Sequence, residues 1–115
     1  MRKLVLILFA ATTLTAFAAD TAVKGHLVDM QCARDEGQKA GFGASHTKDC
    51  LKMAECMQSG YGLLTDDKKI IMFDAAGNEQ AKKFISALTK TSDIKVTVTG
   101  TRNGDTMTVS KIELQ

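Results

Sequence analysis

The chain contains no proline and no tryptophan, and it has few aromatic residues of any kind. Without proline, it is neither a collagen-like chain nor a proline-rich segment. Beyond residue 18, the aromatic residues are Phe42, Tyr61, Phe73 and Phe84. Proteins that bind single-stranded nucleic acid stack the bases on aromatic side chains, so this small number disfavours an oligonucleotide-binding surface.

The only long run without charge lies at the N-terminus. Arg2 and Lys3 precede an uncharged run from Leu4 to Ala19, which contains the small-x-small pattern Ala16-Phe17-Ala18. A basic start, a short apolar middle and a cleavage site of small residues are the three parts of a secretory signal peptide. The strongly apolar part is shorter than the ~20 residues that span a bilayer. We expect residues 1–18 to be a signal peptide cleaved after Ala18, and the mature chain to be periplasmic or secreted.

The mature chain has no excess of positive or of negative charge. The whole sequence has 15 Lys and Arg residues and 13 Asp and Glu residues, and two of the basic residues belong to the predicted signal peptide. The two signs therefore balance in residues 19–115, whose length suits a single domain with one core. A neutral domain lacks the positive surface that binds phosphate groups. We expect neither nucleic acid nor, after cleavage, a membrane as its partner.

Five segments have the composition of strands. They are residues 22–30, 61–65, 69–73, 94–101 and 106–114. Asn103-Gly104 predicts a hairpin between the last two strands, because both residues accept positive φ. The apolar phase of the last strand changes near Ser110-Lys111, which predicts a β-bulge there. The run from Ile70 to Phe73 does not alternate, so we expect that strand to be buried on both faces.

Two segments have the period of helices, residues 50–59 and 78–90. The first is followed by Gly60, a common helix stop. Apolar residues recur in it at i, i+3, i+4 and i+7, which predicts a buried stripe of Cys50, Met53, Ala54 and Met57. Cys56 lies off this stripe. The second helix has the same spacing at Ala81, Phe84, Ile85 and Leu88. Residues 33–49 show neither period, so we expect an irregular loop.

The order of these elements is β-α-β-β-α-β-β, mainly β with two helices. Five short strands with a helix between the third and the fourth are typical of an OB-like barrel. We therefore expect an α+β fold in which residues 19–115 form one five-stranded OB-like barrel. Residues 31–60 would form a loop-helix insertion that carries the cysteines. An open α+β sheet with the same elements is the alternative.

Three short patterns resemble a known group of proteins. The patterns are Gly25-x3-Asp29-x2-Cys32, then His46-x3-Cys50-x5-Cys56-x3-Gly60, and then a late Val98-Thr99-Gly100-Thr101 and Gly104-Asp105-Thr106-Met107-Thr108-Val109. Together they resemble a group of small exported bacterial proteins of unknown function with OB-like strand order. The resemblance covers most of the mature chain. It implies export and a small barrel-like fold, and it implies no activity.

One set of residues has the chemistry of a metal site: Cys32, His46, Cys50 and Cys56. Three thiolates and an imidazole make a four-coordinate set that suits zinc. Soft ligands also suit Cu(I), for which Met53 and Met57 offer thioethers. At helical spacing, however, these two methionines are more typical of core packing. On the basis of the three cysteines and the histidine, we predict zinc or copper as the candidate cofactor. For Asp29 we expect hydrogen bonds to backbone amides, and for His26 a surface or interface position.

A disulfide is the alternative use of the same cysteines, because exported proteins meet an oxidising environment. Cys50 and Cys56 would be ~9 Å apart along a continuous helix, which is too far for a bridge. Cys32 is therefore expected to be one half of the pair. The apolar stripe favours Cys50 as its partner, and a later helix start favours Cys56. The third cysteine stays free in either case.

Three hypotheses of function follow from these patterns. The first is an exported binding domain whose Cys/His loop holds a soft metal ion or a partner, for which an envelope protein is the candidate. The second is a structural or interaction protein of the cell envelope, in which the cysteines only crosslink. The third, a thiol-dependent enzyme with His46 as the base, has the least support, because no orienting carboxylate can be assigned. We expect no catalysis.

Overall fold

A computed structural model describes residue 10 and residues 20–115 of the chain. Apart from Ala10, the predicted signal peptide and its cleavage point after Ala18 lie outside the described residues. No helix in the described part is long and apolar enough to cross a membrane.

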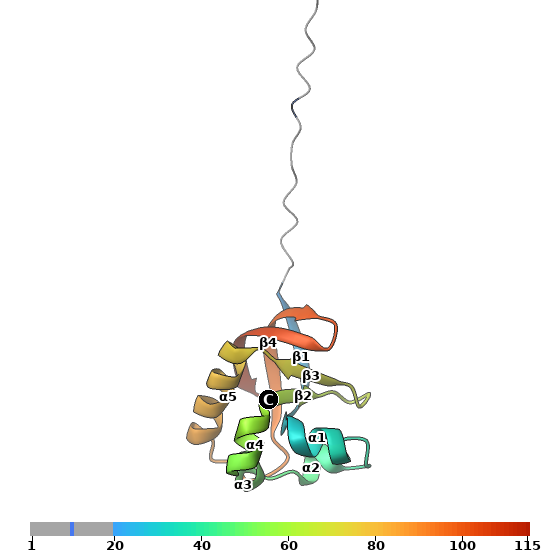
Figure 1. Cartoon of the computed structure of the whole chain (residues 1–115), viewed down its shortest axis with the longest axis vertical. Coiled ribbons are helices and arrows are strands. Elements are labelled where there is room, and N and C mark those ends of the chain that lie inside the picture. Colours follow the sequence, from blue (N-terminus) through green and yellow to red (C-terminus); the bar gives the residue numbers. More distant parts are fainter. Residues whose placement is uncertain (1–9, 11–19) are drawn as a thin grey trace, which may run out of the picture.

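Five strands form one sheet (Figure 1). They are β1 (Thr21–Asp29), β2 (Tyr61–Leu64), β3 (Ile70–Phe73), β4 (Lys95–Asn103) and β5 (Thr106–Leu114). Hydrogen-bonded neighbours follow the order β1-β2-β3-β5-β4, and β4 pairs with β1, so the ring of strands closes. The closure is irregular, because β3 and β5 run parallel and pair at two positions only. The predicted five strands and the α+β class are confirmed.

The predicted bulge lies between β4 and β5. Thr99 pairs with Lys111 and Gly100 pairs with Val109, so Ser110 is the extra residue. The bulge lets Met107 and Val109 keep their side chains in the core although the apolar phase changes after them. The tight hairpin at Asn103-Gly104 is also confirmed, and Gly104 has the positive φ that such a turn requires.

Two hydrophobic clusters lie on opposite faces of β1. Leu27 belongs to the larger cluster and Val28 to the smaller one, as expected of neighbouring residues in a strand. The larger cluster fills the space inside the ring of strands and is closed by α5 (Ala75–Ala87), which buries Ala81 and Ile85. Ala33 and Phe42, from two short helices, belong to the smaller cluster. Figure 1 shows α5 on one side of the strands and these short helices on the other.

The structure contains five helices in its described residues, so the prediction of two helices is wrong. Besides α5 they are α1 (Met30–Glu36), α2 (Phe42–Ser45), α3 (Lys48–Leu51) and α4 (Ala54–Ser59). The segment 33–49 is therefore not an irregular loop. Each of these four helices has only one or two turns, which is too short to show a hydrophobic period. Side-chain caps at Asp29 and Thr47 start α1 and α3.

The predicted helix 50–59 is broken into α3 and α4. Met53 lies between α3 and α4 and has an extended backbone, with ψ at 139°, so the two helices are not continuous. The predicted apolar stripe is wrong as a result. Met53 and Met57 are exposed, at 54% and 37% of their surface, whereas Leu51 and Cys56 are buried. The break turns Cys56 toward the protein interior, which a continuous helix would not do.

Strand β3 is buried on one face rather than on both. Ile71 and Phe73 lie in the larger cluster, whereas Met72 between them is exposed at 37%. The lack of alternation in the sequence is therefore misleading, because an apolar side chain on a solvent face has only a small energetic cost. Gly25 in β1 marks a close approach of two backbones, because a Cβ at this position would collide with the carbonyl oxygen of Leu64.

Candidate functional site

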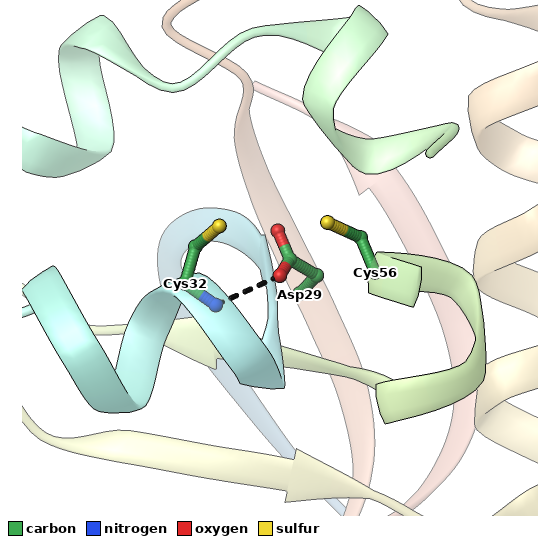
Figure 2. A group of neighbouring side chains, drawn as sticks. All are labelled: Asp29, Cys32 and Cys56. Carbon is green, nitrogen blue, oxygen red and sulfur yellow. Dashed lines mark hydrogen bonds between the residues drawn. The ribbon is translucent and has the colours of Figure 1, made fainter. Parts of the chain in front are cut away.

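Three side chains from three separate elements converge at one end of the sheet (Figure 2). Asp29 is the last residue of β1, Cys32 lies in the first turn of α1, and Cys56 lies in α4. One carboxylate oxygen of Asp29 and the two sulfur atoms all lie within 4.8 Å of one another. In Figure 2 the Asp29 carboxylate stands between the two thiols. We call these three residues the Asp/Cys/Cys group.

Hydrogen bonds of the backbone and of the Ser59 hydroxyl hold the two cysteine-bearing helices together. The amide of Met30, at the start of α1, donates to the carbonyl of Gly60 at 2.9 Å. The next amide, that of Gln31, donates to the Ser59 hydroxyl at 3.1 Å, and this hydroxyl donates in turn to the Cys56 carbonyl at 2.7 Å. The start of α1 is therefore fixed against the end of α4, so the two thiols are placed together without a covalent link.

Asp29 is fully buried, and each oxygen of its carboxylate has a hydrogen-bond partner. Oδ2 accepts a hydrogen bond from the Cys32 amide at 2.9 Å, which caps α1 and confirms the backbone role predicted for this residue. Oδ1 lies 2.7 Å from Nε2 of His46. Burial alone would raise the pKa of Asp29, but these hydrogen bonds and the nearby imidazole outweigh it and hold the pKa below its ordinary value. Because an ionised carboxylate only accepts, Nε2 of His46 is the donor.

His46 supports the group from behind. The residue follows α2, and its amide donates to the carbonyl of Phe42 at 2.9 Å. Its ring packs on the Phe42 ring, with 4.9 Å between the ring centroids, and only 7% of the residue is exposed. The imidazole is therefore fixed by packing on one side and by Asp29 on the other. It contacts the carboxylate of the Asp/Cys/Cys group and is not itself one of the three converging side chains.

Both thiols of the group are held in the protonated form. Burial, and next the negative charge of Asp29, raise the pKa of Cys32 to about 12. The same two causes, in the same order, raise the pKa of Cys56. Tyr61 is also affected, since burial and the Asp29 charge raise its pKa to about 12, and its hydroxyl donates to the Leu51 carbonyl at 2.7 Å. The site thus has one negative charge and two thiols that are mainly protonated at neutral pH, so a metal ion that binds them must displace their protons.

The four residues predicted as ligands are not all brought together. Cys32 and Cys56 are adjacent, His46 is one hydrogen bond away through Asp29, and Cys50 is outside the Asp/Cys/Cys group. Cys50 lies in α3, half-buried, with its amide bonded to the Thr47 hydroxyl. All three cysteines are free thiols in this structure. Sequence reasoning missed Asp29 as a residue that could hold a metal ion together with the two thiols. Its spacing, three residues before Cys32, is that of a helix cap and gave no sign of this.

A second histidine–aspartate pair lies outside this group. Nε2 of His26, in β1, lies 2.7 Å from Oδ1 of Asp93, and the side chains are 16% and 39% exposed. The hydrogen bond from His26 is the main cause that lowers the pKa of Asp93. The pair joins β1 to the segment before β4. Among the hydrogen bonds of the described residues it has no thiol partner, so it offers no soft ligand for a metal ion.

Comparisons with protein-family models, with curated proteins and with solved structures found no match to this chain.

Proposed function

We propose that this protein is a small exported binding domain that holds one soft metal ion, zinc or Cu(I), at the Asp/Cys/Cys group. The observation that carries the proposal is the convergence of one carboxylate oxygen and two sulfur atoms within 4.8 Å of one another. The three residues come from β1, α1 and α4, so the site exists only in the folded chain. Thiolate and carboxylate ligands of this kind are those that zinc takes in proteins.

The composition of the group favours zinc over Cu(I). Two thiolates suit both ions, whereas a carboxylate oxygen is a harder ligand that suits zinc better. Ligating carboxylates are normally oriented by a further hydrogen bond, and His46 supplies one to Asp29 at 2.7 Å. Three protein ligands leave a fourth tetrahedral position for water or for a ligand from solution, which is the coordination of an open site rather than of a closed structural one.

An OB-like barrel fold and a periplasmic or secreted location are part of the same proposal. The ring order β1-β2-β3-β5-β4, with α5 between β3 and β4, supports an OB-like barrel as the class of this sheet. The N-terminal sequence pattern supports a periplasmic or secreted location. The few aromatic residues and the balanced charge of residues 19–115 make a metal ion or an envelope protein a better partner than a nucleic acid.

Metal titration of the reduced protein tests the proposal. Mature protein is reduced, freed of metal and titrated with Co²⁺, which reports tetrahedral thiolate coordination through its absorption bands. Zn²⁺ is then added to displace it. We expect saturation at one equivalent, with the sulfur-to-cobalt charge-transfer band and displacement by zinc. Absence of that band, or binding that persists when both Cys32 and Cys56 are replaced by serine, would contradict the proposed site. A parallel titration with Cu(I) compares the two ions.

The affinity for zinc should increase steeply with pH. The pKa of both thiols is raised above the usual value for cysteine, so both carry a proton at neutral pH, and the ion must displace two protons on binding. Asp29 adds no proton, because its pKa is lowered. The apparent association constant should therefore rise roughly 100-fold per pH unit between pH 6 and 8, after correction for buffer binding. In the Cys56→Ser variant the slope should fall to about tenfold per unit. Competition with a chelator of known affinity measures both slopes.

The alternative function is a disulfide-stapled structural or interaction protein of the envelope, without metal and without catalysis. The proximity of the same two sulfur atoms favours it, since they lie within 4.8 Å. Protein purified from the exported fraction separates the two functions. Alkylation before and after reduction, followed by intact mass, counts the bridges. A single bridge between Cys32 and Cys56 that reductant does not open in the folded protein supports the alternative.

A further inference from the structure

We propose that Cys32 and Cys56 form a reversible disulfide that empties the metal site, and that Asp29 shifts this equilibrium toward the reduced pair. The part of this inference that concerns metal release rests on the proposed metal-binding function. The disulfide itself rests only on the geometry of the two thiols and the carboxylate.

The two sulfur atoms are close enough to be joined by small movements. They lie within 4.8 Å of each other, and a disulfide bond is about 2.05 Å long. The helices that carry them, α1 and α4, have only seven and six residues. The break at Met53 separates α4 from α3, so α4 is not held in line with a longer helix. Side-chain rotation and an approach of the two short helices would therefore bring the sulfur atoms to bonding distance once the Asp29 carboxylate moves from between them.

The two thiols differ in access, which defines the order of the reaction. Cys32 is half-buried, whereas Cys56 is only 4% exposed. A small disulfide RSSR, such as oxidised glutathione, is therefore attacked first by the Cys32 thiolate, which forms a mixed disulfide and releases one RS⁻. The Cys56 thiolate then attacks the Cys32 sulfur, closes the protein disulfide and releases the second RS⁻. Two protein thiols are oxidised, RSSR is reduced to two RSH, and the two protons of the protein thiols pass to the released thiolates.

Asp29 favours the reduced state because of where its charge lies. The carboxylate stands between the two sulfur atoms in Figure 2 and is fully buried. Both sulfur atoms lie within 4.8 Å of one Asp29 oxygen, so the two thiols can offer S–H groups to this charge, whereas a disulfide has no donor to offer. Oxidation therefore leaves a buried carboxylate with fewer favourable contacts, and it also requires the sulfur atoms to close around the carboxylate or displace it. A site that stabilises its reduced form has a more oxidising, and therefore readily reversed, disulfide.

Disulfide and metal exclude each other at this site. A sulfur atom in a disulfide no longer has the thiolate charge that binds zinc, so oxidation removes two of the three protein ligands together. Zinc, in turn, occupies the sulfur lone pairs that would attack an oxidant. The oxidation state of the surroundings would therefore set whether the ion is held or released.

Equilibration of the metal-free protein in glutathione buffers tests the disulfide. The fraction of bridged protein is measured by acid quenching, alkylation and peptide mapping over a range of ratios of oxidised to reduced glutathione. We expect one bridge, between Cys32 and Cys56, that forms and reopens within this range. The Cys50→Ser variant is the matched control and should give the same midpoint. In Asp29→Asn, which keeps an oxygen to cap α1, the midpoint should move about tenfold toward reducing conditions, as expected for loss of an interaction with a charged group.

A second arm tests metal release. Zinc-loaded protein should resist oxidation under conditions that bridge the metal-free protein, and the bridged protein should not bind zinc. A bridge that involves Cys50, no bridge at any ratio, or a bridge that reduced glutathione does not open would overturn the inference. An unshifted midpoint in folded Asp29→Asn would overturn the role of Asp29, and the wild-type and Cys50→Ser data decide the disulfide if that variant does not fold. A reduced protein that binds no metal overturns the proposed function alone.

Discussion

Replacement of Asp29 by alanine is expected to lower the free energy of unfolding of the reduced, metal-free protein by about 3 kcal/mol. The substitution removes the cap of α1, which is worth about 1 kcal/mol. It also leaves the Nε2–H of the buried His46 without its acceptor, which costs about 1–3 kcal/mol. This is a large part of the stability of a small domain. Denaturant unfolding at pH 7, with reductant and chelator present, measures the change.

A second capping aspartate provides the control for this experiment. Asp74 caps α5 and accepts hydrogen bonds from the amides of Gly77 and Val109, with no histidine or thiol among its partners. Asp74→Ala removes the cap and also leaves the amide of Val109 without this acceptor, so it should cost about 2 kcal/mol. Asp29→Asn keeps an acceptor for the cap and should recover part of the loss. Equal costs of the two alanine substitutions would contradict the additional cost that we assign to the unpaired His46.

The strands could be predicted because their signals are local. The alternation in residues 94–101, the Asn103-Gly104 turn and the change of apolar phase at Ser110 are all contained within a few residues, and the pairing of β4 with β5 follows from them. The burial of β3 could not be predicted in the same way. Whether Met72 faces the core depends on which strands flank β3, and its partner β5 is more than thirty residues away in the sequence.

The helical segment between β1 and β2 shows the limit of periodicity as a signal. A stripe at i, i+3, i+4 and i+7 predicts a buried face only if the helix is continuous, and the extended backbone at Met53 breaks it. The cysteine that the stripe placed inside, Cys50, is half-buried, and the one it placed outside, Cys56, is buried. In turns this short, contacts with the rest of the fold decide the orientation, because each turn has little helical stability of its own.

The Asp/Cys/Cys group depends on strand pairing that the sequence does not reveal. Asp29 at the end of β1 pairs with Tyr61 at the start of β2. Since α1 follows the first residue and α4 precedes the second, this one pairing brings Cys32 and Cys56 together from opposite directions along the chain. The thiols and the imidazole of the site could be predicted from the sequence. The buried carboxylate of Asp29, which lies between the thiols and the imidazole, could not.

Removal of either thiol of the group should reduce the affinity for zinc more than about 100-fold, beyond the effect expected of a residue that only orients a ligand. Cys32→Ser and Cys56→Ser each delete one of three protein ligands, and a serine hydroxyl is a poor substitute for a thiolate. His46→Gln should cost about tenfold, because its hydrogen bond positions Asp29 without contact to the ion. Chelator competition on reduced, folded variants measures all three.

Cys50→Ser is the informative comparison, because the sequence and the structure disagree about this residue. The sequence predicts Cys50 as one of four metal ligands, whereas the structure places it in α3, outside the group of converging atoms. If the geometry holds, zinc affinity changes by less than about threefold, well under 1 kcal/mol. A loss as large as that of Cys56→Ser would mean that α3 and α4 rearrange on binding to bring a third thiolate to the ion. The open fourth position would then be filled by sulfur, and the site would be a closed structural one.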